Sequence, residues 1–296
     1  MKTSPALPWL LAAALLWGSL GLGVRAWQSI QTVSGVMVGF WRLSLAVPFL
    51  WIWLLRSRAW RPIQGCHRLW LALYGLMMAL YQITTVGAIA RVGVAVAILL
   101  AICLAPVVVV ILSGLMLQET ITLPVLLGVV TAITGAALVV DWDPQTQVNG
   151  LGIVLGLGSA ICYGVIVLCS RRLAGHYHPI QVLSLSFTIA AAFLTPFFIA
   201  QGSPWPNSGL AWVLVGYIAL VPTVLAYACF LQGIQHSSAT LASITTLLEP
   251  LIATLFAWIL FGESLSFWSG LGAVLLLSSI FWLQAIPRNN TRDPKS

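Results

Sequence analysis

Long apolar stretches alternate with short polar intervals along the whole chain. A helix needs about 20 apolar residues to cross a membrane, and most of these stretches reach that length. Backbone in lipid must satisfy its own hydrogen bonds, so the stretches are predicted to be helices, and their short connections predict antiparallel neighbours. The ten predicted spans are residues 7–28, 33–55, 69–90, 94–117, 123–140, 150–170, 179–200, 210–235, 239–261 and 267–286.

The composition supports a membrane location. Apolar residues make up 60% of the chain, charged residues only 6%, and the mean hydropathy is +1.02. A soluble chain of 296 residues could not remove this much apolar surface from water. We therefore predict an all-α membrane protein with many spans.

A sequence pattern occurs twice, at a shift of 144 residues. In each copy an apolar helix carries a proline, ends at a glutamate and is followed by a Ser or Thr that opens the next helix. The hydroxyl is expected to cap that helix, and the carboxylate is expected to face its positive end. The matching pairs are Pro106 and Pro250, Glu119 and Glu263, Thr122 and Ser266, and Gly128 and Gly272.

The repeat predicts two related halves of opposite orientation. Residues 14–18 also match residues 160–164 at a shift of 146, so the similarity reaches the first and sixth spans. Five spans per half is an odd number, so the second half must enter the membrane from the opposite side. We expect a first repeat over residues 1–141, a second, inverted repeat over 150–286, and a cytoplasmic tail over 287–296. Inverted repeats are typical of transporters that work by alternating access.

Basic residues indicate which side of the membrane each end occupies. Basic residues are enriched in the cytoplasmic loops of membrane proteins. If the N-terminus is cytoplasmic, Arg91 is the one basic loop residue on the external side, and both termini are cytoplasmic. The basic residues then placed on the cytoplasmic side are Lys2, Arg56, Arg58, Arg61, Arg68, Arg171, Arg172, Arg288, Arg292 and Lys295.

Several other functions are not supported by the sequence. The net charge of +7 is spread over short loops and ends, without the clustered basic and aromatic residues of a nucleic-acid site. The five cysteines form no CxxC pair, and His176 and His178 lack a third metal ligand. We therefore expect no cofactor, no metal and no nucleic-acid partner. The sequence also contains no ATP-binding motif. A gradient would drive transport.

The chain resembles the drug/metabolite transporter superfamily, and within it the EamA-type exporters, which include bacterial amino acid exporters. The resemblance rests on residues 16–18, 41–42, 105–119 and 248–263, in order along the chain. It implies ten helices in two inverted five-helix repeats in the bacterial inner membrane. It also implies cytoplasmic termini, a central cavity lined mainly by spans 1, 3, 4, 6, 8 and 9, and export of small metabolites.

Two charged residues inside spans are candidate substrate-binding residues. Arg42 is predicted to lie about 15 Å deep, where a charge normally faces a cavity or a partner. It could anchor a carboxylate or phosphate, or it could serve as a structural charge partner. Glu249 precedes Pro250 within the ninth span, and burial disfavours a charged carboxylate. It could therefore carry a proton, or it could pair with Arg42.

Aromatic and amide side chains are candidates for the cavity wall. Side chains of this kind suit partly apolar metabolites, although membrane tyrosines also occur as ordinary packing residues. The predicted wall residues are Trp17, Tyr81, Gln82, Tyr163 and Tyr227.

Prolines are expected to permit bends during transport, and glutamates at helix ends are expected to be structural. The structural or hinge residues are Pro106, Pro222, Pro250, Glu119 and Glu263. The expected partners are a small-molecule substrate, membrane lipid and protons as candidate coupling ions, with the chain as a monomer or weak homodimer.

Two alternatives to an amino acid exporter stay open. Drugs, nucleosides and sugar derivatives are possible substrates. An intramembrane enzyme acting on lipid or peptide is a second class, but it would need a nucleophile with a base, a carboxylate pair or metal ligands within the spans. The histidines lie at or beyond the ends of spans, and Glu249 has no second carboxylate nearby in sequence, so we do not predict an enzyme.

Overall fold

The computed structural model describes residues 5–117, 119, 121–140, 149–202, 205–261 and 266–285. Throughout this part the chain is helical, without strands. Nine helical stretches within it are long and apolar enough to cross a membrane, and Leu123–Val139 is a shorter apolar helix. Together they correspond to the ten predicted spans. Glu263 and the tail over 287–296 lie outside the described residues.

The first half supplies five spans. The break between α1 and α2 lies at Ser19, whose hydroxyl donates to the carbonyl of Leu16 at 2.7 Å. Gly93 interrupts the long α4 helix with a φ angle of 75°, a backbone conformation that is strained for residues other than glycine. The elements are α1 (Ala6–Gly18), α2 (Leu20–Gln28), α3 (Gly35–Ser57), α4 (Gly65–Ile98), the π-helical segment η1 (Leu99–Cys103), α5 (Ala105–Met116) and α6 (Leu123–Val139).

The second half supplies the other five. A π-helical segment joins α9 to α10 within one span, whereas the next span is broken at Leu247, between α11 and α12. The elements are α7 (Gly150–Leu173), α8 (Pro179–Ala200), α9 (Gly209–Ala219), η2 (Leu220–Leu225), α10 (Ala226–Ile234), α11 (Ala239–Thr246), α12 (Leu248–Phe261) and α13 (Phe267–Ala285).

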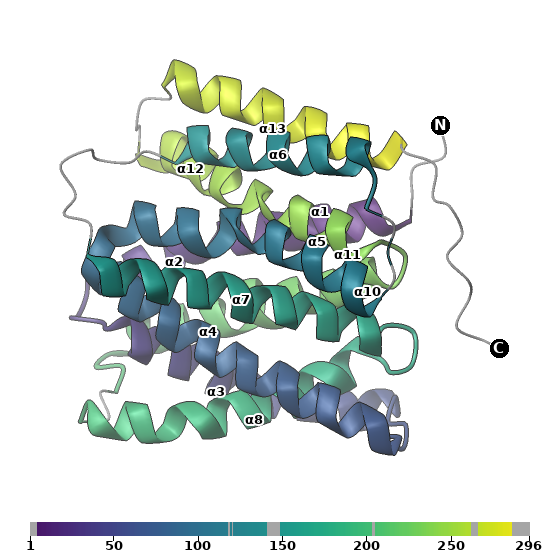
Figure 1. Cartoon of the computed structure of the whole chain (residues 1–296). Helices are drawn as coiled ribbons and strands as arrows, with labels where there is room; N and C mark the ends of the chain where they lie inside the picture. Colours follow the sequence, from purple (N-terminus) through teal and green to yellow (C-terminus); the bar gives the residue numbers. More distant parts are fainter. Residues whose placement is uncertain are drawn as a thin grey trace.

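The most extensive helix contacts join one half to the other. The main pairs are α4 with α7, α6 with α13, α3 with α8, and α1 with α10. Figure 1 shows α6 beside α13 at one edge of the bundle and α3 beside α8 at the opposite edge. The contact of α1 with α10 has its counterpart in the contact of α7 with α4. The span of α1 corresponds to that of α7 in the other repeat, and the span of α10 corresponds to that of α4. The packing therefore follows the inverted repeat.

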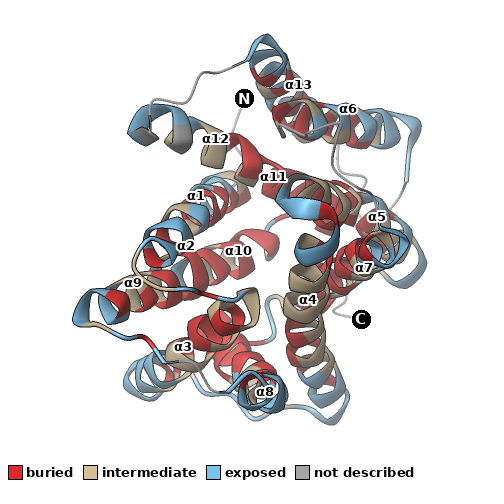
Figure 2. Cartoon of the chain, turned by 90° about the vertical axis from the view of Figure 1, so that its left-hand side faces the viewer, coloured by how far each residue is buried: buried red, intermediate tan, exposed pale blue. Residues whose placement is uncertain are grey.

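Paired glycines bring α6 and α13 close together. A Cβ atom at Gly272 would lie 2.5 Å from the carbonyl oxygen of Gly135, and one at Gly135 would lie 2.8 Å from that of Gly272. Small residues at such crossings allow the close backbone approach common between membrane helices. The outer faces of these two helices are largely exposed, whereas buried residues gather on α7 and α10 (Figure 2). The exposed apolar faces are those that lipid would cover.

The predicted hydroxyl cap is present at one copy and absent at the other. The Ser266 hydroxyl accepts a hydrogen bond from the backbone N–H of Ser269 at 3.0 Å. Among the described residues, the Thr122 side chain makes no such bond to α6. Glu119 caps a different helix from the expected one, because its carboxylate accepts from the Ala239 N–H at 2.9 Å and from the Thr240 hydroxyl at 3.3 Å. Glu119 therefore stabilises the N-terminus of α11, in the other half.

Candidate functional site

Arg42 is held in the interior by the π-helical segment η2. Only 7% of its surface is exposed, and its Nε donates to the Thr223 hydroxyl at 3.1 Å. Pro222 has no N–H, so it cannot donate to the carbonyl of Ile218 one helical turn earlier. The Thr223 hydroxyl donates to that carbonyl at 2.8 Å and accepts from Arg42 with its remaining lone pair. Local helix chemistry at a proline thus provides the arginine with its partner.

Glu249 lies where the ninth span is broken. It is in the first turn of α12, immediately after the interruption at Leu247, and its side chain is half-buried. The positive end of a helix favours a carboxylate at this position. Arg42 acts on Glu249 electrostatically, although the two side chains come from opposite halves of the chain. The sequence placed Glu249 in mid-span; the structure adds that the helix begins again there.

Three tyrosines lie near Glu249, namely Tyr81 of α4, Tyr163 of α7 and Tyr227 of α10. The rings of Tyr81 and Tyr163 lie 5.7 Å apart, centre to centre. Tyr163 and Tyr227 are buried, whereas Tyr81 is half-buried, so the group has both an accessible side and a buried side.

Trp17 and Gln82 complete the predicted set. Trp17 meets Tyr227 edge to face at 5.0 Å between ring centres and packs on Phe230 at 5.4 Å. Gln82 faces α3, where a Cβ atom added at Gly39 would lie 2.9 Å from its Nε2 atom. Six of the seven predicted binding residues, from six spans, are thus linked to one another, whereas Gln82 is, among the described residues, linked only to α3.

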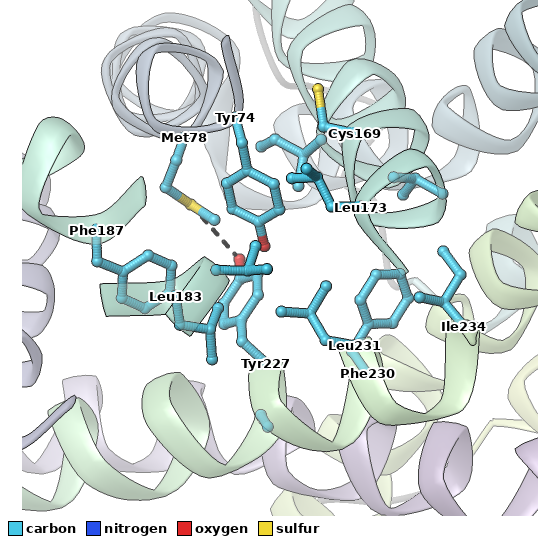
Figure 3. Packing of buried hydrophobic residues seen from close by; sticks show 14 of the residues in the cluster. Tyr74, Met78, Cys169, Leu173, Leu183, Phe187, Tyr227, Phe230, Leu231 and Ile234 are labelled. Carbon is cyan, nitrogen blue, oxygen red and sulfur yellow. Dashed lines mark hydrogen bonds between the residues drawn. The ribbon is translucent and has the colours of Figure 1, made fainter. Parts of the chain in front are cut away.

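An aromatic and aliphatic layer lies beside Tyr227, and the sequence did not predict it. The Tyr227 hydroxyl donates to the sulfur of Met78 at 3.7 Å, and Phe187 meets the Tyr227 ring at 5.4 Å (Figure 3). Tyr74 points its ring into the same layer and is fully buried. Met78 and Tyr74 lie one and two turns from Tyr81 on α4, so helical spacing from a predicted residue could have indicated them.

The prolines predicted as hinges lie at helix irregularities. Pro106 follows η1 at the start of α5, Pro222 lies inside η2, and Pro250 is in the first turn of α12. Interruptions of this kind free backbone groups and are the usual sites of bending. No motion has been observed at these positions, so their role as hinges stays a prediction.

Comparison with known proteins identifies the family. The model of the EamA-like transporter family matches residues 4–141 and 150–284, which is nearly the whole chain. The chain belongs to the EamA-like transporter family. It is thus a multi-pass membrane protein of the drug/metabolite transporter superfamily, as the motifs indicated.

Relatives of this EamA-family protein are themselves named as transporters. "Uncharacterized transporter YwfM" of Bacillus subtilis is 27% identical over 287 residues, covering 94% of this chain and 93% of its own. An "Uncharacterized transporter" of Archaeoglobus fulgidus is 27% identical over 209 residues, covering 69% of this chain and 74% of its own. A solved crystal structure shares the fold, with a TM-score of 0.79 and 19% identity over 95% of this chain and 96% of the other.

Proposed function

We propose that this transporter exports amino acids or closely related small metabolites across the bacterial inner membrane by alternating access, with both termini in the cytoplasm. The proposal rests on the buried Arg42, which is close enough to Glu249 to interact with it electrostatically, and on three tyrosines near Glu249. A buried arginine and a half-buried glutamate close to three tyrosines fit a zwitterion with an apolar part.

Arg42 is the proposed anchor for the substrate carboxylate. Its Nε donates to Thr223, which orients the guanidinium beside Tyr227, and its terminal N–H groups are the proposed donors to the ligand. A planar pair of N–H groups matches a carboxylate in a bidentate arrangement. Thr223 therefore contributes to binding by orienting Arg42.

Glu249 is the proposed partner of the substrate amino group, and it exchanges that partner for a proton when the site is empty. Its position at the start of α12 lets a small rotation of α12 against α11 change its surroundings. Such a carboxylate would couple substrate movement to a proton gradient, since the same group cannot bind the ammonium and the proton together.

Counterflow in proteoliposomes tests the proposal. Purified protein would be reconstituted in vesicles loaded with unlabelled candidate amino acids, and uptake of each radiolabelled amino acid would be followed. We expect exchange that disappears in Arg42→Ala and Glu249→Gln and persists in Arg91→Gln, whose exposed arginine donates to the carbonyl of Gly87 in its own helix at 3.0 Å. Parental rates in both site variants, with normal folding, would contradict the site. Exchange of nucleosides or sugars without amino acids would contradict the substrate class.

Proton coupling and orientation need separate measurements. Imposing a pH gradient should accelerate net transport in the parental protein and leave Glu249→Gln unaffected; equal acceleration of both would remove Glu249 as the coupling residue. Cysteines introduced singly at Asp141 and Ser296 should react with impermeant reagents from opposite faces of the membrane. Reaction from the same face would contradict the inverted arrangement.

A further inference from the structure

A groove of about 410 Å³ lies on the outside of the bundle, away from the candidate site. One wall is a single face of α3, formed by Phe49, Ile52, Trp53 and Arg56 at spacings of three, four and seven residues. The other wall is η2, continued by Leu225. The residues at its rim are exposed, so the groove opens toward the surface that lipid covers.

The groove results from the way the helices separate. α3 packs on α9 and η2, whereas α10, which continues the same span, packs on α1. Pro48 in α3 directly precedes the groove residue Phe49, and Pro222 lies in η2 between the groove residues Leu220 and Val224. Proline in a helix removes a backbone hydrogen bond and permits a bend. The concave shape is therefore built into the course of two spans.

The chemistry of the groove differs between its two ends. From Phe49 to about the level of Trp53 the lining is apolar and partly aromatic, whereas Arg56 lies in the last turn of α3. Seven residues of helix separate Phe49 from Arg56, which corresponds to about 10 Å, roughly two thirds of the hydrocarbon depth of one leaflet. A molecule that fits must have an apolar chain running into the membrane and a negative group at the membrane surface.

We propose that this groove binds one phospholipid with a net negative headgroup, such as phosphatidylglycerol, with an acyl chain along the α3 face and its phosphate at Arg56. Guanidinium pairs with phosphate in a planar, bidentate geometry, and basic pockets between membrane helices favour anionic headgroups. Arg58, two residues further along the chain, adds positive charge at the same surface but does not line the groove.

The lipid would also support the candidate site from behind. η2 separates the groove from Arg42: Leu220 and Val224 face the groove, whereas Thr223 faces inward and is fully buried. A π-helical segment is a local irregularity, so filling the groove should limit its movement. The bound lipid is therefore a structural partner of the segment that orients Arg42. The lipid site itself rests on the membrane location of the chain and not on the identity of the transported substrate.

Native mass spectrometry of the delipidated full chain tests the proposal. Phosphatidylglycerol or phosphatidylcholine would be added to the parental protein and to Arg56→Gln, with Arg58→Gln as the matched control. We expect one phosphatidylglycerol to bind more tightly than phosphatidylcholine in the parental protein. Arg56→Gln should weaken its binding by about fivefold, the effect of one basic residue near anionic lipid, and Arg58→Gln should change it by less than about twofold.

A second variant tests the groove independently of charge. Leu225→Trp places a larger side chain at the exposed rim, where 42% of Leu225 is accessible, so folding should be preserved. It should reduce phosphatidylglycerol retention at unchanged circular dichroism. Equal losses in Arg56→Gln and Arg58→Gln would show that general surface charge attracts the lipid, and unchanged retention in Leu225→Trp would show that lipid binds elsewhere. A lipid-free species at twice the chain mass would show that a second copy occupies this face. Each of these three results would overturn the proposal.

Discussion

The Nε of Arg42 in the first half of the chain donates to the Thr223 hydroxyl in the second half, at 3.1 Å. The Thr223 hydroxyl in turn donates to the carbonyl of Ile218, to which Pro222 cannot donate. One hydroxyl therefore bonds to its own helix beside a proline and positions a buried charge across the interface between the halves.

Replacing Thr223 by Val should destabilise the protein. The change keeps the side-chain volume but leaves the Nε of Arg42 and the Ile218 carbonyl without this partner in a buried site. Losing a hydrogen bond to a buried charged group costs about 1.5–3 kcal/mol. Thermal unfolding in detergent would measure it. Thr131→Val is the control, because the exposed Thr131 hydroxyl donates to the Leu127 carbonyl of its own helix. Equal effects of the two substitutions would contradict the assignment.

Replacing Arg42 by Lys should reduce exchange of the proposed substrates by at least about tenfold. Lysine keeps the charge but lacks the planar fork that binds a carboxylate and Thr223 at once. Counterflow in proteoliposomes would measure the rate, and size-exclusion chromatography would verify folding. An Arg42→Lys variant that exchanges like the parent would show that charge alone is needed.

Removing the Glu119 carboxylate should loosen the contact between the two halves. Glu119→Ala takes away the acceptor for the Ala239 N–H and the Thr240 hydroxyl at the start of α11. Loss of such a cap costs about 0.5–2 kcal/mol, which thermal unfolding would detect. Thr122→Val should have no measurable effect, since Thr122 makes no cap bond among the described residues. A larger loss in Thr122→Val than in Glu119→Ala would reverse this interpretation.

Replacing Tyr74 by Phe should stabilise the packed layer beside Tyr227. The Tyr74 hydroxyl is buried and, among the described residues, makes no hydrogen bond of ordinary geometry, although the Ser170 side chain lies close to it (Figure 3). A buried unsatisfied hydroxyl costs about 1–3 kcal/mol, so its removal should raise the unfolding temperature. Tyr227→Phe should not stabilise, because it removes a bond to Met78. An unfolding temperature lowered by Tyr74→Phe would indicate that the hydroxyl is hydrated.

The spans could be predicted because they depend on local composition. Apolar run lengths predict the ten spans, and the duplicated proline and glutamate positions indicate the two halves. Partners across the halves could not be predicted in the same way. Glu119 lies close in sequence to the start of α6, but its carboxylate reaches α11, because that contact depends on how two distant spans pack. The same holds for the candidate site. Its seven predicted residues could be recognised in the sequence as polar or aromatic positions within spans. Thr223 could be recognised as the partner of Arg42 only from the structure of η2.

The pairing of helices between the halves constrains how the protein is made. α1, α4 and α6 leave the ribosome before α10, α7 and α13, with which they share their main contacts. The early helices must therefore wait in the bilayer with their inward faces unmatched until the later ones have been synthesised. Assembly is completed only after α13 is inserted, so a nascent chain stopped after α6 would be a substrate for membrane quality control.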